Sequence, residues 1–178
     1  MADDPSTLIE QSSEARRRGD PAAAMRLAAE AVDLARASDD KVALGTALAA
    51  MARLRRDEQQ YDAAVRLYEE SAAVARQCGD KRALAHRLRH IGDIAAEQDD
   101  LQVAESSYAE AERLFEGMDV GELDKANFLR SKALLSEMQG ESETAIQLWQ
   151  EAQKVYRASR IDEGVKECGT HMDMLRAS

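Results

Sequence analysis

The strongest constraint on the fold of this chain is an internal repeat with a period of about 40 residues. Ala24, Ala64, Ala104 and Ala145 recur at an almost constant spacing, with one extra position before the last of them. The fourth residue after each alanine is Ala28, Tyr68, Tyr108 or Trp149, and the seventh is Ala31, Ser71, Ala111 or Ala152. Twelve residues before each alanine stands another small residue, which is Ser12, Ala52, Gly92 or Ala133. Two small-residue positions per repeat predict two closely packed helices, stacked four times.

The third repeat resembles the tetratricopeptide repeat most clearly. Residues 88–111 contain Leu88, Ile91, Gly92 and Ala95, followed by Ala104, Tyr108 and Ala111. That family pairs W-x2-L-G-x2-Y on a first helix, helix A, with A-x3-F-x2-A on a second, helix B. The long period is similar to that of the repeats in kinesin light chain and in the helical sensor arms of bacterial regulators. The resemblance implies an all-α solenoid, a right-handed superhelix of four helix hairpins.

We predict one domain over residues 1–178, with repeats at about 5–38, 41–78, 81–117 and 121–158 and a capping helix at 162–176. Aspartates and glycines at the expected ends predict helices at about 5–18, 21–37, 41–58, 61–77, 81–98, 101–116, 121–139, 143–158 and 162–176. The last helix carries one apolar stripe of Ile161, Val165, Cys168, Met172 and Leu175. Such a helix closes the end of a stack, and the alternative is an interface for another copy or a partner helix.

Composition limits the classes of partner and compartment. The 178 residues carry a net charge of -10 and only 4% aromatic residues, which disfavours nucleic acid and acidic membranes as partners. An acidic start and the lack of a long apolar run predict a cytoplasmic protein. There we expect Cys78 and Cys168 to stay reduced, with Cys78 serving as a small packing residue.

No sequence motif predicts catalysis or a cofactor. We find no phosphate loop, nucleophile elbow or dinucleotide fingerprint, so we predict a protein that is not an enzyme. His86 and His90 lie one helical turn apart with Asp93 beyond them, a spacing that could suit a metal. Because Arg87 and Arg89 would repel a cation, we predict no metal site.

The resemblance implies a concave groove lined by helix A residues, and here arginine dominates that lining. An acidic protein with a basic groove suits an acidic or phosphorylated segment of a partner. We expect Arg53 and Arg89 to be exposed; the alternative is that they pair with Asp93 and neighbouring carboxylates. The predicted partner-binding residues are Arg16, Arg53, Arg56, His86, Arg89, His90, Asp93, Asn127 and Arg130. The carboxylate-clamp positions of the family hold Ile9, Ser13, Ala50, His86 and His90 here, which disfavours a clamp for chaperone C-termini.

The outer face carries a repeated acidic position. Glutamate recurs as Glu30, Glu70, Glu110 and Glu151, and Arg26 and Arg66 precede the first two by four residues. Pairing at i,i+4 on a solvated helix face explains this pattern. The sequence therefore predicts an adaptor that binds a protein or peptide in its groove, as a monomer or a homodimer. The alternative is a self-associating structural or sensor-arm module that dimerises through its end helices.

Overall fold

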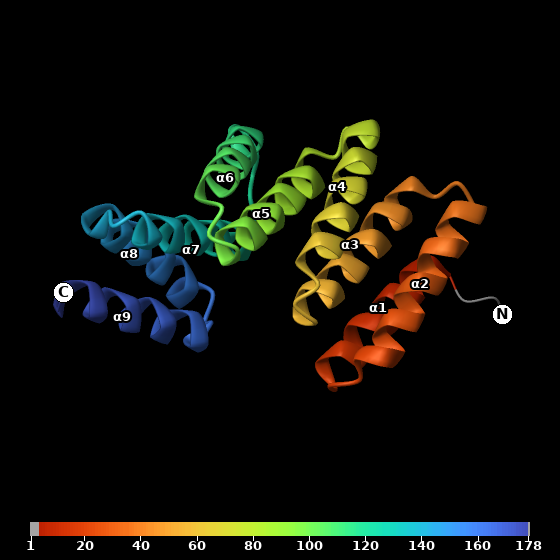
Figure 1. Cartoon of the computed structure of the whole chain (residues 1–178), viewed down its shortest axis with the longest axis horizontal. Coiled ribbons are helices and arrows are strands. Elements are labelled where there is room, and N and C mark those ends of the chain that lie inside the picture. Colours follow the sequence, from red (N-terminus) through yellow and green to blue (C-terminus); the bar gives the residue numbers. More distant parts are fainter. Residues whose placement is uncertain (1–3, 178) are drawn as a thin grey trace. The chain divides into compact units, whose positions relative to one another are not determined.

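The computed structural model describes residues 4–177, and within that range the chain is entirely helical, as predicted (Figure 1). Its helices are α1 (Pro5–Arg17), α2 (Pro21–Ala37), α3 (Lys41–Asp57), α4 (Tyr61–Cys78), α5 (Lys81–Glu97), α6 (Leu101–Phe115), α7 (Glu122–Met138), α8 (Ser142–Ala158) and α9 (Asp162–Ala177). The predicted helices agree with these bounds to within one or two residues. This agreement is expected because periodicity and capping are local signals.

Aspartate side chains start four of the helices. Their carboxylates accept hydrogen bonds of 2.9–3.2 Å from backbone N–H groups three residues later, at Asp20, Asp40, Asp80 and Asp100. Each bond satisfies one of the unpaired N–H groups of a first helical turn. Asp4 makes no such side-chain bond. The predicted glycines lie at turns with φ of +69° to +79°, a left-handed conformation that costs glycine little, at Gly19, Gly79, Gly117 and Gly140.

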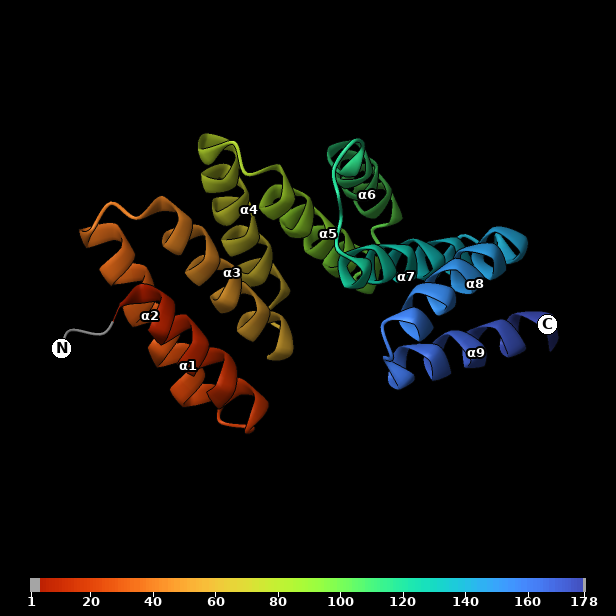
Figure 2. The same cartoon turned by 180° about the vertical axis from the view of Figure 1, so that it is seen from behind.

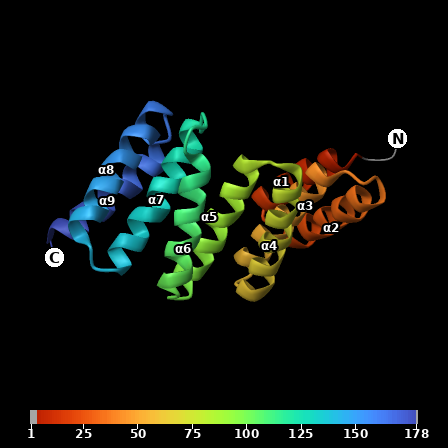
Figure 3. The ribbon, with the colours of Figure 1, turned by 90° about the horizontal axis from the view of Figure 1, so that it is seen from above.

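The chain divides into two compact units, which we describe separately: an N-terminal unit up to residue 94 and a C-terminal unit from residue 95. The N-terminal unit contains the hairpins α1–α2 and α3–α4 and most of α5, with α3 packed against α2 (Figure 2). The C-terminal unit contains α6 to α9, in which α8 packs between α7 and α9 (Figure 3). The prediction of a single domain and that of a right-handed superhelix stay predictions.

Small residues let the helices approach closely, as the repeat predicted. The four repeat alanines are fully buried, at Ala24, Ala64, Ala104 and Ala145. In the N-terminal unit, Tyr68 packs with Ala52, Ala64 and Ile91. In the C-terminal unit, Trp149 is fully buried with Tyr156 and Met172, so its predicted core position is confirmed.

Helix α9 uses its apolar stripe to pack against the rest of the C-terminal unit. Cys168 and Met172 are buried in the core that contains Trp149, and the other members of the stripe are packed against that core. Gly164 marks the closest approach, because a Cβ there would lie 2.6 Å from Cγ of Tyr156. Cys78, in contrast, is exposed, so its predicted packing role is wrong. It ends α4, where the chain turns toward solvent.

Candidate functional site

The predicted groove residues fall into two sets, one in each unit. Helices α3 and α5 of the N-terminal unit carry Arg53, Arg56, His86, Arg89, His90 and Asp93. Arg16 on α1 belongs to the same unit, whereas Asn127 and Arg130 lie on α7 of the C-terminal unit. A groove that joins the two sets stays a prediction.

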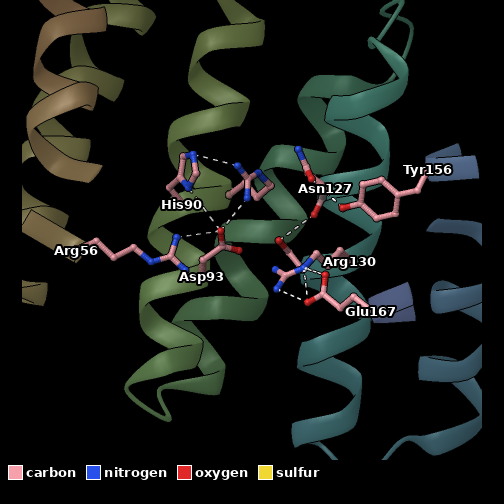
Figure 4. Close-up of polar contacts among 9 residues, drawn as sticks. Arg56, His90, Asp93, Asn127, Arg130, Tyr156 and Glu167 are labelled. Atoms are coloured by element: carbon pink, nitrogen blue, oxygen red, sulfur yellow. Dashed lines mark hydrogen bonds and ion pairs between the residues drawn. The ribbon is translucent and has the colours of Figure 1, made fainter. Parts of the chain in front are cut away.

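Asp93 is the central carboxylate of the N-terminal set (Figure 4). It is 9% exposed, accepts a 2.8 Å hydrogen bond from Arg89 and lies 3.5 Å from a guanidinium nitrogen of Arg56. The Arg89 side chain is only 12% exposed, so the expectation that it is exposed is wrong. The alternative, pairing with Asp93, is what the structure contains. A buried carboxylate holds a guanidinium close because neither charge is well solvated there.

Arg53 is exposed, as predicted. Within residues 4–177, none of the carboxylates is paired with it. Arg16 differs, because its guanidinium bonds Asp57 at 2.5 and 3.0 Å and so links α1 to α3. His86 is half-buried on α5, one turn before His90. Arg53 is therefore the cation of this set that is best placed to meet a ligand.

His90 stacks on Tyr68, with ring centroids 5.0 Å apart and planes 14° from parallel. Its Nε2 lies 3.0 Å from Nη2 of Arg89, and because a guanidinium can only donate, Nε2 accepts and Nδ1 carries the proton. Nδ1 is 3.5 Å from Asp93, which is long for a hydrogen bond. Burial lowers the pKa of His90 to about 4, so the ring is neutral near pH 7.

Two residues that the sequence prediction missed complete this set. Tyr68, 1% exposed, has a buried hydroxyl with no hydrogen-bond partner in the described part of the chain. Burial raises its pKa, while the charges of Arg53, Arg56, Arg87 and Arg89 act to lower it. Arg87 donates from Nε to Ser71 Oγ at 2.9 Å, and burial lowers the pKa of Arg87. The available signals were the repeat position of Tyr68 and the spacing of Arg87, one helical turn before His90.

The C-terminal set is internally paired (Figure 4). Arg130 on α7 donates to both carboxylate oxygens of Glu167 on α9, with distances of 2.6 to 2.9 Å, and this bonding lowers the pKa of Glu167. Asn127 accepts a 2.8 Å hydrogen bond from the Tyr156 hydroxyl on α8. Both predicted residues therefore connect helices of this unit, with polar groups already engaged.

The repeated glutamates of the second helices are mostly exposed, as predicted, but Glu70 does not form the predicted i,i+4 pair. Glu30, Glu70 and Glu151 are exposed, whereas Glu110 is half-buried. Glu70 pairs with Arg36 of α2 at 2.8 Å rather than with Arg66, because neighbouring second helices of the repeats lie close enough for a cross-helix pair. Among the residues described, no group of three or more His, Cys, Asp or Glu side chains is placed to hold a metal ion.

These observations define the class of protein as one built from stacked helical hairpins. A family model described as tetratricopeptide repeat matches residues 44–117. Residues 44–117 therefore match the tetratricopeptide repeat, as predicted, and this repeat points to a scaffold for protein interactions. A second model, described as anaphase-promoting complex subunit 5, matches residues 7–58.

Two solved structures show the same fold. The apo form of RapI matches with a TM-score of 0.80 and 15% identity, covering 92% of this chain and 60% of that one. This chain therefore spans less than two thirds of the RapI structure. BtubC (BKLC) from P. vanneervenii matches with a TM-score of 0.67 and 19% identity, covering 97% of this chain and 79% of that one. No curated protein matches the chain in sequence. No helix in the described range is long and apolar enough to span a membrane.

Proposed function

We propose that this protein is a non-enzymatic adaptor and that its N-terminal unit binds an acidic segment of a partner protein. The observation that supports this most is the charge around Tyr68, where four arginines act on one buried hydroxyl. Asp93 is already engaged by Arg89, and Arg53 is exposed beside this cluster. A forked guanidinium binds carboxylate and phosphate groups bidentately, so an acidic ligand suits this surface.

The net charge of the chain narrows where such a ligand can bind. At -10, the protein as a whole repels acidic peptides, so such a peptide needs a local basic surface. Within the N-terminal unit, Glu30 and Glu70 are exposed on α2 and α4, the second helices of their repeats, and not on α3 or α5. The ligand should therefore bind beside Arg53 rather than on the outer face.

The test measures binding of a hexaglutamate peptide by titration calorimetry, with hexaglutamine as the neutral comparison. Arg53→Glu should weaken hexaglutamate binding about tenfold or more, and the loss should shrink at high salt. Arg66→Glu makes the same charge change at an exposed position of α4 and should alter affinity less than about threefold. Equal losses in the two variants would mean that only net charge matters, and would contradict the proposal.

A further inference from the structure

The chain builds the same pair of stacked rings twice, once in each unit. Trp149 follows Tyr68 by the same number of positions as His171 follows His90, and that offset is two repeat periods. The N-terminal pair has ring centroids 5.0 Å apart and planes inclined by 14°, and the C-terminal pair has 4.5 Å and 21°. The repeat therefore relates not only the single residues but also the geometry of their contact. This makes the C-terminal pair an internal reference for the N-terminal one.

The C-terminal pair is completed by a carboxylate from its own unit. Glu137, near the end of α7, accepts a hydrogen bond from Nε1 of Trp149. Both of its carboxylate oxygens lie 3.0 Å from Nδ1 of His171. One acidic side chain, 20% exposed, thus binds one ring nitrogen of each residue.

The N-terminal pair has no such acceptor, because the residue that precedes Glu137 by this same offset is Arg56. In the described part of the chain, the buried side-chain polar atoms without a hydrogen-bond partner are the Tyr68 hydroxyl and Nδ1 of His90. Nδ1 carries a proton, and a hydroxyl can always donate, so both atoms can serve as donors. A buried donor left without an acceptor destabilises the folded chain.

The surroundings add further donors rather than acceptors. Arg87 is half-buried, and its Nε donates to Ser71. Arg53, on α3, is exposed. Asp93, the buried carboxylate on the same side of α5, is bonded to Arg89. Asp93 also lies 3.5 Å from Nδ1 of His90, too far for a good hydrogen bond, so neither this nitrogen nor the Tyr68 hydroxyl has a carboxylate at hydrogen-bonding distance.

We propose that the Tyr68–His90 pair is the binding site for one carboxylate of a partner protein, an aspartate or glutamate side chain that takes the part Glu137 plays in the other unit. This inference rests on the proposed function and names the anchor within it. The His90 side chain is 17% exposed, so the pair borders solvent. The Tyr68 hydroxyl and Nδ1 of His90 are themselves covered by the chain, so binding of the carboxylate requires the side chains above them to move aside.

The first experiment removes only the hydroxyl. Tyr68→Phe should weaken hexaglutamate binding about tenfold, as expected for one lost hydrogen bond to a charged group. Its melting temperature without peptide should be unchanged or higher, because an unpaired buried hydroxyl has been removed. Tyr156→Phe is the matched control, since that hydroxyl already bonds Asn127. It should lower the melting temperature and leave peptide affinity within about twofold.

The second experiment observes the rings directly. The chain has three histidines, so imidazole ¹⁵N resonances can be assigned by single substitutions. Hexaglutamate should shift the His90 resonances and leave those of His171 in place. Arg56→Glu, which installs the residue found at the matching place of the C-terminal unit, should abolish the shift by filling the site internally.

The outcomes distinguish this inference from the proposed function, which is binding of an acidic segment beside Arg53. If Tyr68→Phe binds the peptide with full affinity and the His90 resonances do not move, the carboxylate site at Tyr68 and His90 is wrong. If Arg53→Glu still weakens binding in that case, the proposed function stands without this site. If the unaltered protein does not bind hexaglutamate at all, the proposed function itself is wrong.

Discussion

The two units solve the same packing problem with opposite electrostatics. Each stacks a histidine on the large aromatic residue of a second helix, but Glu137 satisfies the C-terminal rings whereas arginines surround the N-terminal ones. The apolar seams are alike, since the repeat alanines are fully buried in both. At the position where the C-terminal unit carries Glu137, the N-terminal unit carries Arg56, and the proposal that only the N-terminal pair binds a ligand rests on this difference in charge.

The largest expected difference between the two units is the response of their stability to acid. The His90 ring stays neutral in the folded protein down to pH about 4, whereas an unfolded histidine binds a proton below about 6.5. The unfolded state therefore binds more protons between these values, and stability falls as pH falls through this window. The full loss is about 3 kcal/mol, of which roughly half appears by pH 5.5. Urea unfolding between pH 7.5 and 5 should show this loss, and His90→Gln should make the free energy of unfolding depend less on pH. If the variant loses stability as steeply as the unaltered protein, His90 is not the cause.

The close approach of α8 and α9 is the next largest test, and it probes the C-terminal unit alone. Gly164→Ala places a methyl group 2.6 Å from the Tyr156 ring and should cost about 2 kcal/mol. Gly169→Ala on the same helix is the control, because its added Cβ has its nearest contact at 3.6 Å. That variant should be neutral or slightly stabilising, since alanine favours a helix over glycine. Similar thermal melts for the two variants would mean that α9 is not held this tightly.

Removing the carboxylate that closes the C-terminal pair should cost less, about 1–2 kcal/mol. Glu137→Ala leaves Nε1 of Trp149 and Nδ1 of His171 without their shared acceptor. Arg56→Ala, at the matching position, should cost about 1 kcal/mol or less, because Asp93 keeps its bond to Arg89. Chemical denaturation of both variants checks the order, and a larger loss for Arg56→Ala would reverse our view of which unit is closed.

The cysteines give the smallest expected effect. Cys168→Ser buries a hydroxyl in an apolar core and should cost about 1 kcal/mol. Cys78→Ser is exposed and should change stability by less than about 0.5 kcal/mol. Burial raises the pKa of Cys168 to about 11, so a thiol reagent at pH 8 should label Cys78 first. Labelling of both thiols at one rate would show that the core around Cys168 opens readily.

The sequence predicted the backbone well and the polar contacts poorly. Helix ends follow from nearby residues such as Asp40 and Gly79, and buried seams follow from the repeat, so both are readable from one chain. The partner of Arg89 was open, because several carboxylates lay within reach of a long side chain. His171 was missed for a different reason. A capping helix is not expected to share the repeat register of α5, although the sequence alone contains the matching offset.

The stacked tryptophan has a practical consequence for spectroscopy. Trp149 is the one tryptophan of the chain, and it lies against an imidazole and a carboxylate in the C-terminal unit. Its emission should therefore change when that unit unfolds. It should not change when a peptide binds beside Tyr68. Replacing Tyr68 with tryptophan in a Trp149→Phe background would move the fluorophore to the other ring pair. The fluorescence emission of this variant would then report ligand binding directly.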